Sequence, residues 1–150
     1  MRGWRWWRIG KRLRQIKLLV LDVDGVLTDG GLWFDASGQL TKRFDVRDGL
    51  GIRLLQQAGV EIAFLSGGQG GATEVRAHQL GIEHCLVGIK DKPEALLQLQ
   101  QRLGIDIAET AFNGRNIIVE TELCGPGNTA ERSFVRDTAK GGDFAVAQCA

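Results

Sequence analysis

Two aspartates stand two residues apart after an apolar segment, in the run Asp22-Val23-Asp24-Gly25. The preceding residues, 16–21, are mainly apolar and β-favouring, which is typical of a strand covered on both faces. In an extended chain both carboxylates would point to the same side, and two adjacent like charges require a counter-ion, a proton or a metal ion. We therefore interpret the pair as a functional site, with a turn or a helix cap as the alternative.

Phosphoryl transfer is the chemistry that such a pair supports. One aspartate can attack phosphorus and form an aspartyl-phosphate, while the other protonates the leaving oxygen and later activates water. Mg²⁺ suits the site because it binds through one or two carboxylates and substrate oxygens. Ser66, in the glycine-rich turn 66–71, could donate hydrogen bonds to a phosphate. Lys92 could supply positive charge; the alternatives are a helix cap for Ser66 and a solvated surface position for Lys92.

Strands and helices that alternate along the chain would position these residues. The strands are predicted at 16–21, 60–65 and 85–87 and from 110, and the helices at 48–59 (capped by Asp48), 75–80 and 92–103. This order predicts a doubly wound, Rossmann-like parallel α/β sheet. Ligands bind beyond the carboxyl ends of the strands in such sheets, where the candidate residues all fall. Residues 32–44 predict a β-hairpin around a glycine-containing turn.

Composition places the chain among ordinary soluble domains. Its 150 residues suffice for one domain with a substantial core, and 43% are hydrophobic and 25% charged. The formal net charge of +1 gives no general attraction for polyanions. We see no secretory signal or membrane-spanning segment. The three cysteines (Cys85, Cys124 and Cys149) lack metal-ligand spacing, so we expect reduced thiols and a cytoplasmic protein.

The first 15 residues differ from the rest of the chain. They carry six Lys or Arg residues and three Trp residues with no acid (Arg2, Arg5, Arg8, Lys11, Arg12, Arg14, Trp4, Trp6 and Trp7). Such a segment could bind a membrane surface or a nucleic acid. We expect instead a mobile, solvated leader, followed by a single α/β domain over residues 16–150.

The motifs together resemble a known family. The run from Asp22 to Gly30 resembles the first motif of the haloacid dehalogenase-like phosphatases. More narrowly, residues 42–53 (KRFDVRDGLGIR) resemble the capless branch that hydrolyses 3-deoxy-D-manno-octulosonate 8-phosphate, and the match extends over about residues 17–112. The resemblance implies a Rossmann-like sheet with a hairpin flap and no cap domain. It also implies a cytoplasmic, Mg²⁺-dependent phosphatase of lipopolysaccharide biosynthesis.

The same resemblance implies roles for individual residues. Asp22 would be the nucleophile and Asp24 the acid/base, both near Mg²⁺, and Ser66 and Lys92 would hold the phosphoryl group. The residues that would contact the sugar acid are Asp45, Val46, Arg47, Asp48, Gly49, Arg53 and Arg76. The relatives form homotetramers in which hairpins equivalent to residues 32–44 pack together and complete neighbouring sites. From the residues alone, the three arginines could equally be surface charges.

Three departures from the family pattern bear on activity. Gly68 stands where the second motif has arginine, Arg115 and Asn116 replace the acids of the fourth motif, and the chain before residues 141–146 is shorter than expected. A sequence error within 113–140, or decay after about residue 113, would explain the last two. A cation in place of a metal carboxylate predicts weak metal binding and slow turnover. These departures favour one alternative, an impaired pseudo-phosphatase that binds or oligomerises. A second alternative keeps the chemistry and changes the substrate to a nine-carbon sialic-acid-type phosphate.

Overall fold

A computed structural model describes residues 13–114, 133–137 and 142–146. The elements in chain order are β1 (Leu18–Leu21), β2 (Trp33–Phe34), β3 (Leu40–Thr41), α2 (Val46–Gln57), β4 (Glu61–Leu65), α3 (Ala72–Gln79), β5 (His84–Leu86), α4 (Lys92–Leu103), a 3-10 turn (Ile107–Glu109), β6 (Thr110–Asn113), β7 (Ser133–Asp137) and β8 (Gly142–Val146). The predicted leader up to residue 12, Arg115, Asn116, Cys124 and Cys149 lie outside the described residues.

A six-stranded sheet forms the centre of the fold, in the order β5-β4-β1-β6-β8-β7. The strand β1 is parallel to β4 on one side and to β6 on the other, and β4 is parallel to β5. Leu21, the last residue of β1, pairs with Phe64 and Asn113. The predicted doubly wound parallel sheet is therefore confirmed for these four strands, and their carboxyl ends meet at one edge.

The far edge of the sheet is antiparallel, and it lies in the C-terminal part of the chain, which the sequence predicted to be shortened or irregular. There β8 is antiparallel to β6, and β7 is antiparallel to β8. Only residues 138–141 separate the two strands, which is enough for a hairpin connection but too short for the crossover that parallel neighbours need. Neither 133–137 nor 142–146 was predicted to form a strand, and the sheet is mixed because this hairpin extends it.

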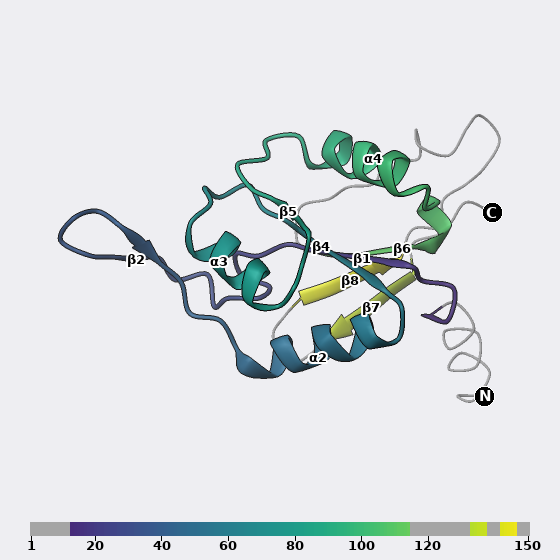
Figure 1. Ribbon diagram of the computed structural model, residues 1–150, viewed down its shortest axis with the longest axis horizontal. Helices are drawn as coiled ribbons and strands as arrows, with labels where there is room; N and C mark the ends of the chain where they lie inside the picture. Colours follow the sequence, from purple (N-terminus) through teal and green to yellow (C-terminus); the bar gives the residue numbers. More distant parts are fainter. Residues whose placement is uncertain (1–12, 115–132, 138–141, 147–150) are drawn as a thin grey trace.

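Side chains that alternate along the central strands fill two cores, one on each face. On one face Leu21 and Phe64 pack with residues of α2 and α3, such as Ile52 and Leu80. On the other face Val20 packs with residues of α4, in a cluster that also holds Leu18, Ala63, Leu65, Leu96, Leu99 and Phe112. Figure 1 shows α4 on one side of the sheet and α2 on the other. This is the arrangement that the continuous apolar strands predicted.

The helix α2 begins two residues before the predicted cap. The N-cap is Asp45, whose extended backbone (φ −88°, ψ 135°) lets its side chain accept the Arg47 N–H. The prediction that Asp48 caps this helix is therefore wrong, and Asp48 lies in the first turn. The predicted start of α4 at Lys92 is confirmed: Asp91 is the N-cap and accepts the Glu94 N–H, with Pro93 in the first turn.

The predicted hairpin is confirmed and extends away from the sheet (Figure 1). Trp33 pairs with Thr41 and Phe34 with Leu40, while the Asp35 carboxylate accepts N–H groups across the turn. Leu32, Trp33 and Phe34 are between 57% and 65% exposed. Among the described residues no helix is both long and apolar enough to cross a membrane.

Candidate active site

Asp22 is held between the ends of β1 and β6. Its side chain accepts the Val23 N–H at 2.8 Å, and its own N–H donates to the Asn113 carbonyl at 2.9 Å. The residue is only 7% exposed. The backbone at residue 114 lies close to Asp22, because a Cβ at Gly114 would be only 3.0 Å from Asp22 Cβ. The position of Asp22 is thus fixed by the sheet itself.

Lys92 reaches Asp22 from the first turn of α4, as the sequence predicted. Its Nζ donates to Asp22 Oδ2 at 2.7 Å, and the two side chains are 14% and 9% exposed. An unpaired carboxylate at this depth would be costly. The ion pair therefore compensates the charge of Asp22 and rules out a solvated surface position for Lys92.

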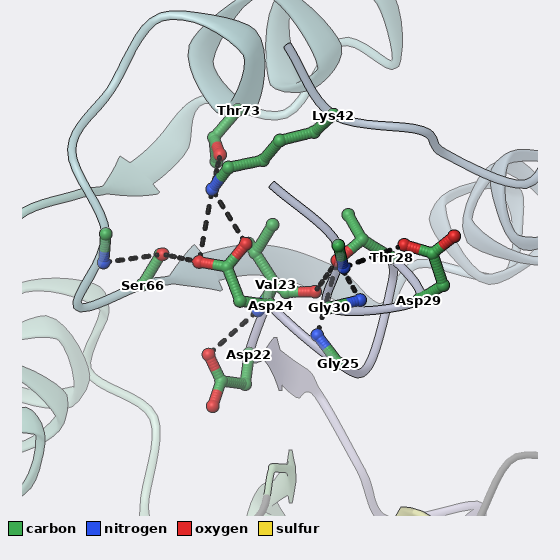
Figure 2. A network of polar contacts seen from close by, with 12 residues as sticks. Asp22, Val23, Asp24, Gly25, Thr28, Asp29, Gly30, Lys42, Ser66 and Thr73 are labelled. Carbon is green, nitrogen blue, oxygen red and sulfur yellow. Dashed lines mark hydrogen bonds and ion pairs between the residues drawn. The ribbon is translucent and has the colours of Figure 1, made fainter. Parts of the chain in front are cut away.

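Asp24 contacts a different lysine, which was not among the predicted site residues. Lys42 Nζ lies 2.8 Å from Asp24 Oδ1 and 3.1 Å from Oδ2, and it is 3.4 Å from Thr73 Oγ1 (Figure 2). The chain turns at residues 24–27, so residues 22–24 do not continue as an extended strand and the two carboxylates bind separate lysines. The available sequence signal was a lysine at the base of the hairpin, where the chain returns to the sheet.

The loop after Asp24 is closed by Thr28, which sequence reasoning also missed. Thr28 Oγ1 accepts the N–H groups of Gly25 and Gly30 at 3.3 and 3.2 Å and donates to the Val23 carbonyl at 3.5 Å. Gly25 has a φ of +78°, a backbone conformation that residues other than glycine rarely adopt. The Asp-Gly pair and the threonine therefore form one tight loop that sets the direction of Asp24.

Ser66 joins the same network from the end of β4. It is fully buried, its Oγ accepts the Gly68 N–H at 3.1 Å, and it donates to Asp24 Oδ2 at 3.5 Å. The N-cap of the following helix α3 is Gly71, so the alternative of Ser66 as a helix cap is wrong. Ser66, Asp24 and Lys42 thus come together from β4, the β1 loop and the hairpin (Figure 2).

Two clefts meet at Asp24. The larger, of about 1180 Å³, is lined by the hairpin, the turn after β4 and α3, and includes Lys42, Gly68 and Arg76. The smaller, of about 780 Å³, is lined by the β1 loop and the start of α2, and includes Asp45, Val46 and Arg47. Asp48, Gly49 and Arg53 line neither of these two clefts.

The predicted sugar-acid residues make contacts with one another as well. Arg47 binds Asp45 through Nη2 at 2.7 Å and Nε at 3.1 Å, and this pairing raises the pKa of the Arg47 guanidinium. Arg76 donates to the Asp45 carbonyl at 3.3 Å and lies over the Phe44 ring.

Two further members of the predicted set connect α2 with α3. A Cβ at Gly49 would lie 2.6 Å from Arg76 Nη2, so the glycine makes room for that guanidinium. Arg53 on α2 donates to the Gln79 carbonyl at the end of α3. Their contact with a sugar acid stays a prediction.

Oxygen atoms of the two aspartates and of Asn113 could coordinate a cation. Asp24 Oδ1 and Asn113 Oδ1 are buried and accept no hydrogen bond within the described part of the chain, although Asp24 Oδ1 lies in the ion pair with Lys42. The same part holds no group of three His, Cys, Asp or Glu side chains placed to bind a metal. The described donors are therefore two carboxylates and one amide oxygen, a hard oxygen set of the kind that Mg²⁺ accepts when substrate and water complete it.

Comparisons with known proteins show which enzymes the chain is similar to. No protein-family model matches the chain. The chain is 41% identical over 104 residues to the 3-deoxy-D-manno-octulosonate 8-phosphate phosphatase KdsC of Haemophilus influenzae; the match covers 69% of this chain and 58% of that protein. It is 37% identical over 107 residues to the same enzyme of Escherichia coli K12, covering 71% and 57% of the two chains. The chain thus spans less than two thirds of the length of these relatives.

Solved structures give the same result. A structure of 3-deoxy-D-manno-octulosonate 8-phosphate phosphatase from Moraxella catarrhalis, in complex with magnesium, phosphate and KDO, superposes with a TM-score of 0.67 at 39% identity, covering 70% of this chain and 60% of that one. A hydrolase of the HAD superfamily, subfamily III A, from Legionella pneumophila superposes with a TM-score of 0.66 at 40% identity, covering 68% and 56%.

Proposed function

Because this chain belongs to the haloacid dehalogenase-like superfamily, in its 3-deoxy-D-manno-octulosonate 8-phosphate phosphatase branch, we propose that it hydrolyses a phosphorylated sugar acid. The observation that carries the proposal is the buried pair of Asp22 and Lys92, 2.7 Å apart, next to Asp24 at the carboxyl end of the central strand. The substrate that the relatives favour is 3-deoxy-D-manno-octulosonate 8-phosphate, and the products would be the free sugar acid and phosphate.

The residues divide the reaction between them. Asp22 attacks phosphorus, the bond to the ester oxygen breaks, and an aspartyl-phosphate forms. Asp24 gives its proton to the departing oxygen and then takes one from the water that hydrolyses the intermediate. Lys92, already in contact with Asp22 Oδ2, offsets negative charge on the transferring group. Ser66 and the backbone N–H groups of the turn that follows it bind the phosphoryl oxygens.

Mg²⁺ is the proposed cofactor, as in the magnesium complex of the Moraxella relative. Asp22 and Asp24 would hold it, with Asn113 Oδ1 as a further oxygen donor, and it would neutralise charge on the phosphoryl group. Arg115 and Asn116 stand where the resemblance expects carboxylates, so we propose weak metal binding and slow turnover relative to the intact relatives.

The surroundings of the site suggest how the sugar acid and a second subunit would bind. The sugar acid would lie in the clefts beside Asp24, where Arg47 and Arg76 line the walls and its carboxylate would compete with Asp45 for Arg47. The exposed side chains of Leu32, Trp33 and Phe34 fit a homotetramer in which hairpins pack together. We also propose that the enzyme is cytoplasmic. Residues 1–15 would form a leader, and residues 16–150 a single domain.

Phosphate release from purified protein tests the proposal. The full chain is assayed with 3-deoxy-D-manno-octulosonate 8-phosphate, a nine-carbon sialic-acid-type phosphate and a neutral sugar phosphate, with Mg²⁺ and with EDTA. We expect Mg²⁺-dependent release that prefers the first substrate and falls at least about 10³-fold in Asp22→Asn, which removes the nucleophile. Equal release from all three substrates, or from Asp22→Asn, would contradict the proposal. Absence of release from the full chain would favour the pseudo-phosphatase alternative.

The fourth-motif substitution has its own test. Arg115→Asp restores a carboxylate where the resemblance expects one, and we expect tighter Mg²⁺ binding in a calorimetric titration together with faster turnover. Arg115→Ala separates relief of repulsion from gain of a ligand, because it removes the cation alone. Equal, high activity in the unmodified chain and in Arg115→Asp would contradict the assignment of a weakened metal site.

A further inference from the structure

Lys42 brings a buried positive charge to the site from outside the sheet. Its side chain is only 1% exposed, although the residue follows directly after β3 of the hairpin. Lysine is almost never buried to this extent without a partner, because its ammonium loses hydration. The buried ammonium of Lys42 therefore needs partners that offset its loss of hydration.

The contacts of the ammonium identify these partners. Nζ lies against both carboxylate oxygens of Asp24, at 2.8 and 3.1 Å, and near Thr73 Oγ1 at 3.4 Å. Thr73 is fully buried on α3, so it offers the ammonium a second, fixed acceptor besides Asp24 Oδ2. The ammonium is therefore held on one side by α3 and directed at Asp24 on the other.

Gly68 leaves this space open. A Cβ at residue 68 would lie 2.8 Å from Asp24 Oδ2 and 3.4 Å from Lys42 Nζ. A side chain there would thus enter the volume where the ammonium meets the carboxylate. The substitution of the family's arginine by Gly68 and the burial of Lys42 are consistent with each other in this chain.

We propose that Lys42 is a positioning residue that acts through Asp24. It fixes the direction of the Asp24 carboxylate and compensates its charge, as Lys92 does for Asp22, and it makes the hairpin a part of the active site. This rests on the proposed function, and the ion pair bears on its second step, in which the ionised Asp24 takes a proton from the water that hydrolyses the aspartyl-phosphate. Proton transfer requires hydrogen-bond reach, and a shift of the base by about 1 Å can cost about 10²-fold in rate.

Kinetics test the positioning role. Lys42→Met keeps the length of the apolar side chain and removes the charge. We expect kcat to fall about 10²-fold while KM stays within about threefold, because the substitution acts on the transition state through Asp24. Lys42→Arg should recover at least about tenfold of that loss, because the guanidinium also binds a carboxylate. An unchanged kcat, or a rise in KM alone, would overturn the proposal.

Lys17 provides a matched control. It forms a carboxylate pair of the same kind, 2.7 Å from Glu109, at the opposite end of β1 and exposed to solvent. Lys17→Met should leave kcat within about twofold, since it removes an equivalent charge far from Asp24. An equal fall of kcat in Lys17→Met and Lys42→Met would assign the effect to general destabilisation.

Unfolding measurements test the contact without any need for turnover. In urea, Lys42→Met, Asp24→Asn and the double variant form a mutant cycle. Asp24→Asn changes the unfolding equilibrium constant by some factor in the wild-type chain. We expect that factor to be at least about fivefold smaller in the Lys42→Met background. If the changes in the free energy of unfolding simply add, the proposed contact between Lys42 and Asp24 is wrong. Lys42→Gln, which keeps polarity without charge, replaces Lys42→Met in the cycle if that variant does not fold.

The two outcomes are separable. If the full chain releases no phosphate, the proposed function fails while the mutant cycle still decides whether Lys42 holds Asp24. If the chain is active and the cycle is additive, only the role of Lys42 fails.

Discussion

The two ends of the central sheet carry lysine–carboxylate pairs of equal length and different surroundings. At the carboxyl end Lys92 lies 2.7 Å from Asp22, and the side chains are 14% and 9% exposed. At the opposite end Lys17 lies 2.7 Å from Glu109, and the exposures are 62% and 28%. Distance alone therefore does not distinguish a functional pair from a surface one, and burial does.

The reason lies in the environment of the charges. An exposed pair gains little, because water and salt screen its attraction, whereas a buried pair must offset the loss of hydration of both groups. Asp22 and Lys92 both accept this cost, whereas in the neighbouring pair it falls on the lysine, because the Lys42 side chain is 1% exposed and the Asp24 side chain 36%. A fold that needed only stability would have placed apolar residues there, so the comparison marks the carboxyl edge as the site of chemistry.

Removal of Lys92 should give the largest difference between the two ends. Lys92→Met leaves the Asp22 carboxylate buried without its counter-ion, and we expect about 3 kcal/mol lower stability. With the charge for the phosphoryl group gone, kcat should fall about 10²- to 10³-fold. Urea unfolding and phosphate release measure both effects, with Lys17→Met as the control. A similar loss of stability in both variants would contradict the comparison.

A single methyl group at Gly68 should act more weakly. In Gly68→Ala the new Cβ would lie 2.8 Å from Asp24 Oδ2, so the carboxylate must move, and we expect kcat to fall about tenfold. Gly51→Ala on α2 is the control, because nothing lies within 4 Å of a Cβ at that position. Equal activity of the two alanine variants would show that the position of Asp24 tolerates the added volume.

Loss of the Thr73 hydroxyl should have a smaller effect. Thr73→Val keeps the shape of a fully buried side chain and removes the acceptor near Lys42 Nζ. We expect a loss of stability of about 1 kcal/mol in urea unfolding, and Thr73→Ser, which keeps the hydroxyl, should retain most of the wild-type value. A more stable Thr73→Val would mean that Lys42 gains nothing from this contact.

The smallest effect should come from the exposed pair, and it should depend on pH. Lys17 donates to Glu109 and lowers the pKa of that carboxyl below its ordinary value. The folded state therefore holds this proton less tightly than the unfolded chain, so the pair contributes stability above the ordinary pKa and loses it as the pH falls through the folded pKa. Thermal unfolding of wild type and Lys17→Met should differ slightly at pH 7 and converge in acid. A difference that grows in acid would contradict this sign.

Local chemistry made much of the fold and half of the site predictable. Apolar strands, glycine-containing turns and the cap and proline at the start of α4 indicated the four parallel strands and placed Asp22, Ser66 and Lys92 together. These features depend on neighbours in the sequence and on the rule that parallel strands end at one edge. The antiparallel hairpin of β7 and β8 was not predicted, because its strands lack a strong apolar alternation in the sequence.

The sequence by itself determined which acids and which lysine would meet at the end of β1, and which family the chain resembles. Only the tertiary structure decided that Asp24 has a lysine of its own. Lys42 lies 18 residues away along the chain, on a hairpin whose local pattern specifies only its own turn. Its ammonium reaches Asp24 because α3 supplies Thr73 and the turn after β4 supplies a glycine. Because three separate elements make this contact, the local sequence of any one of them does not predict it.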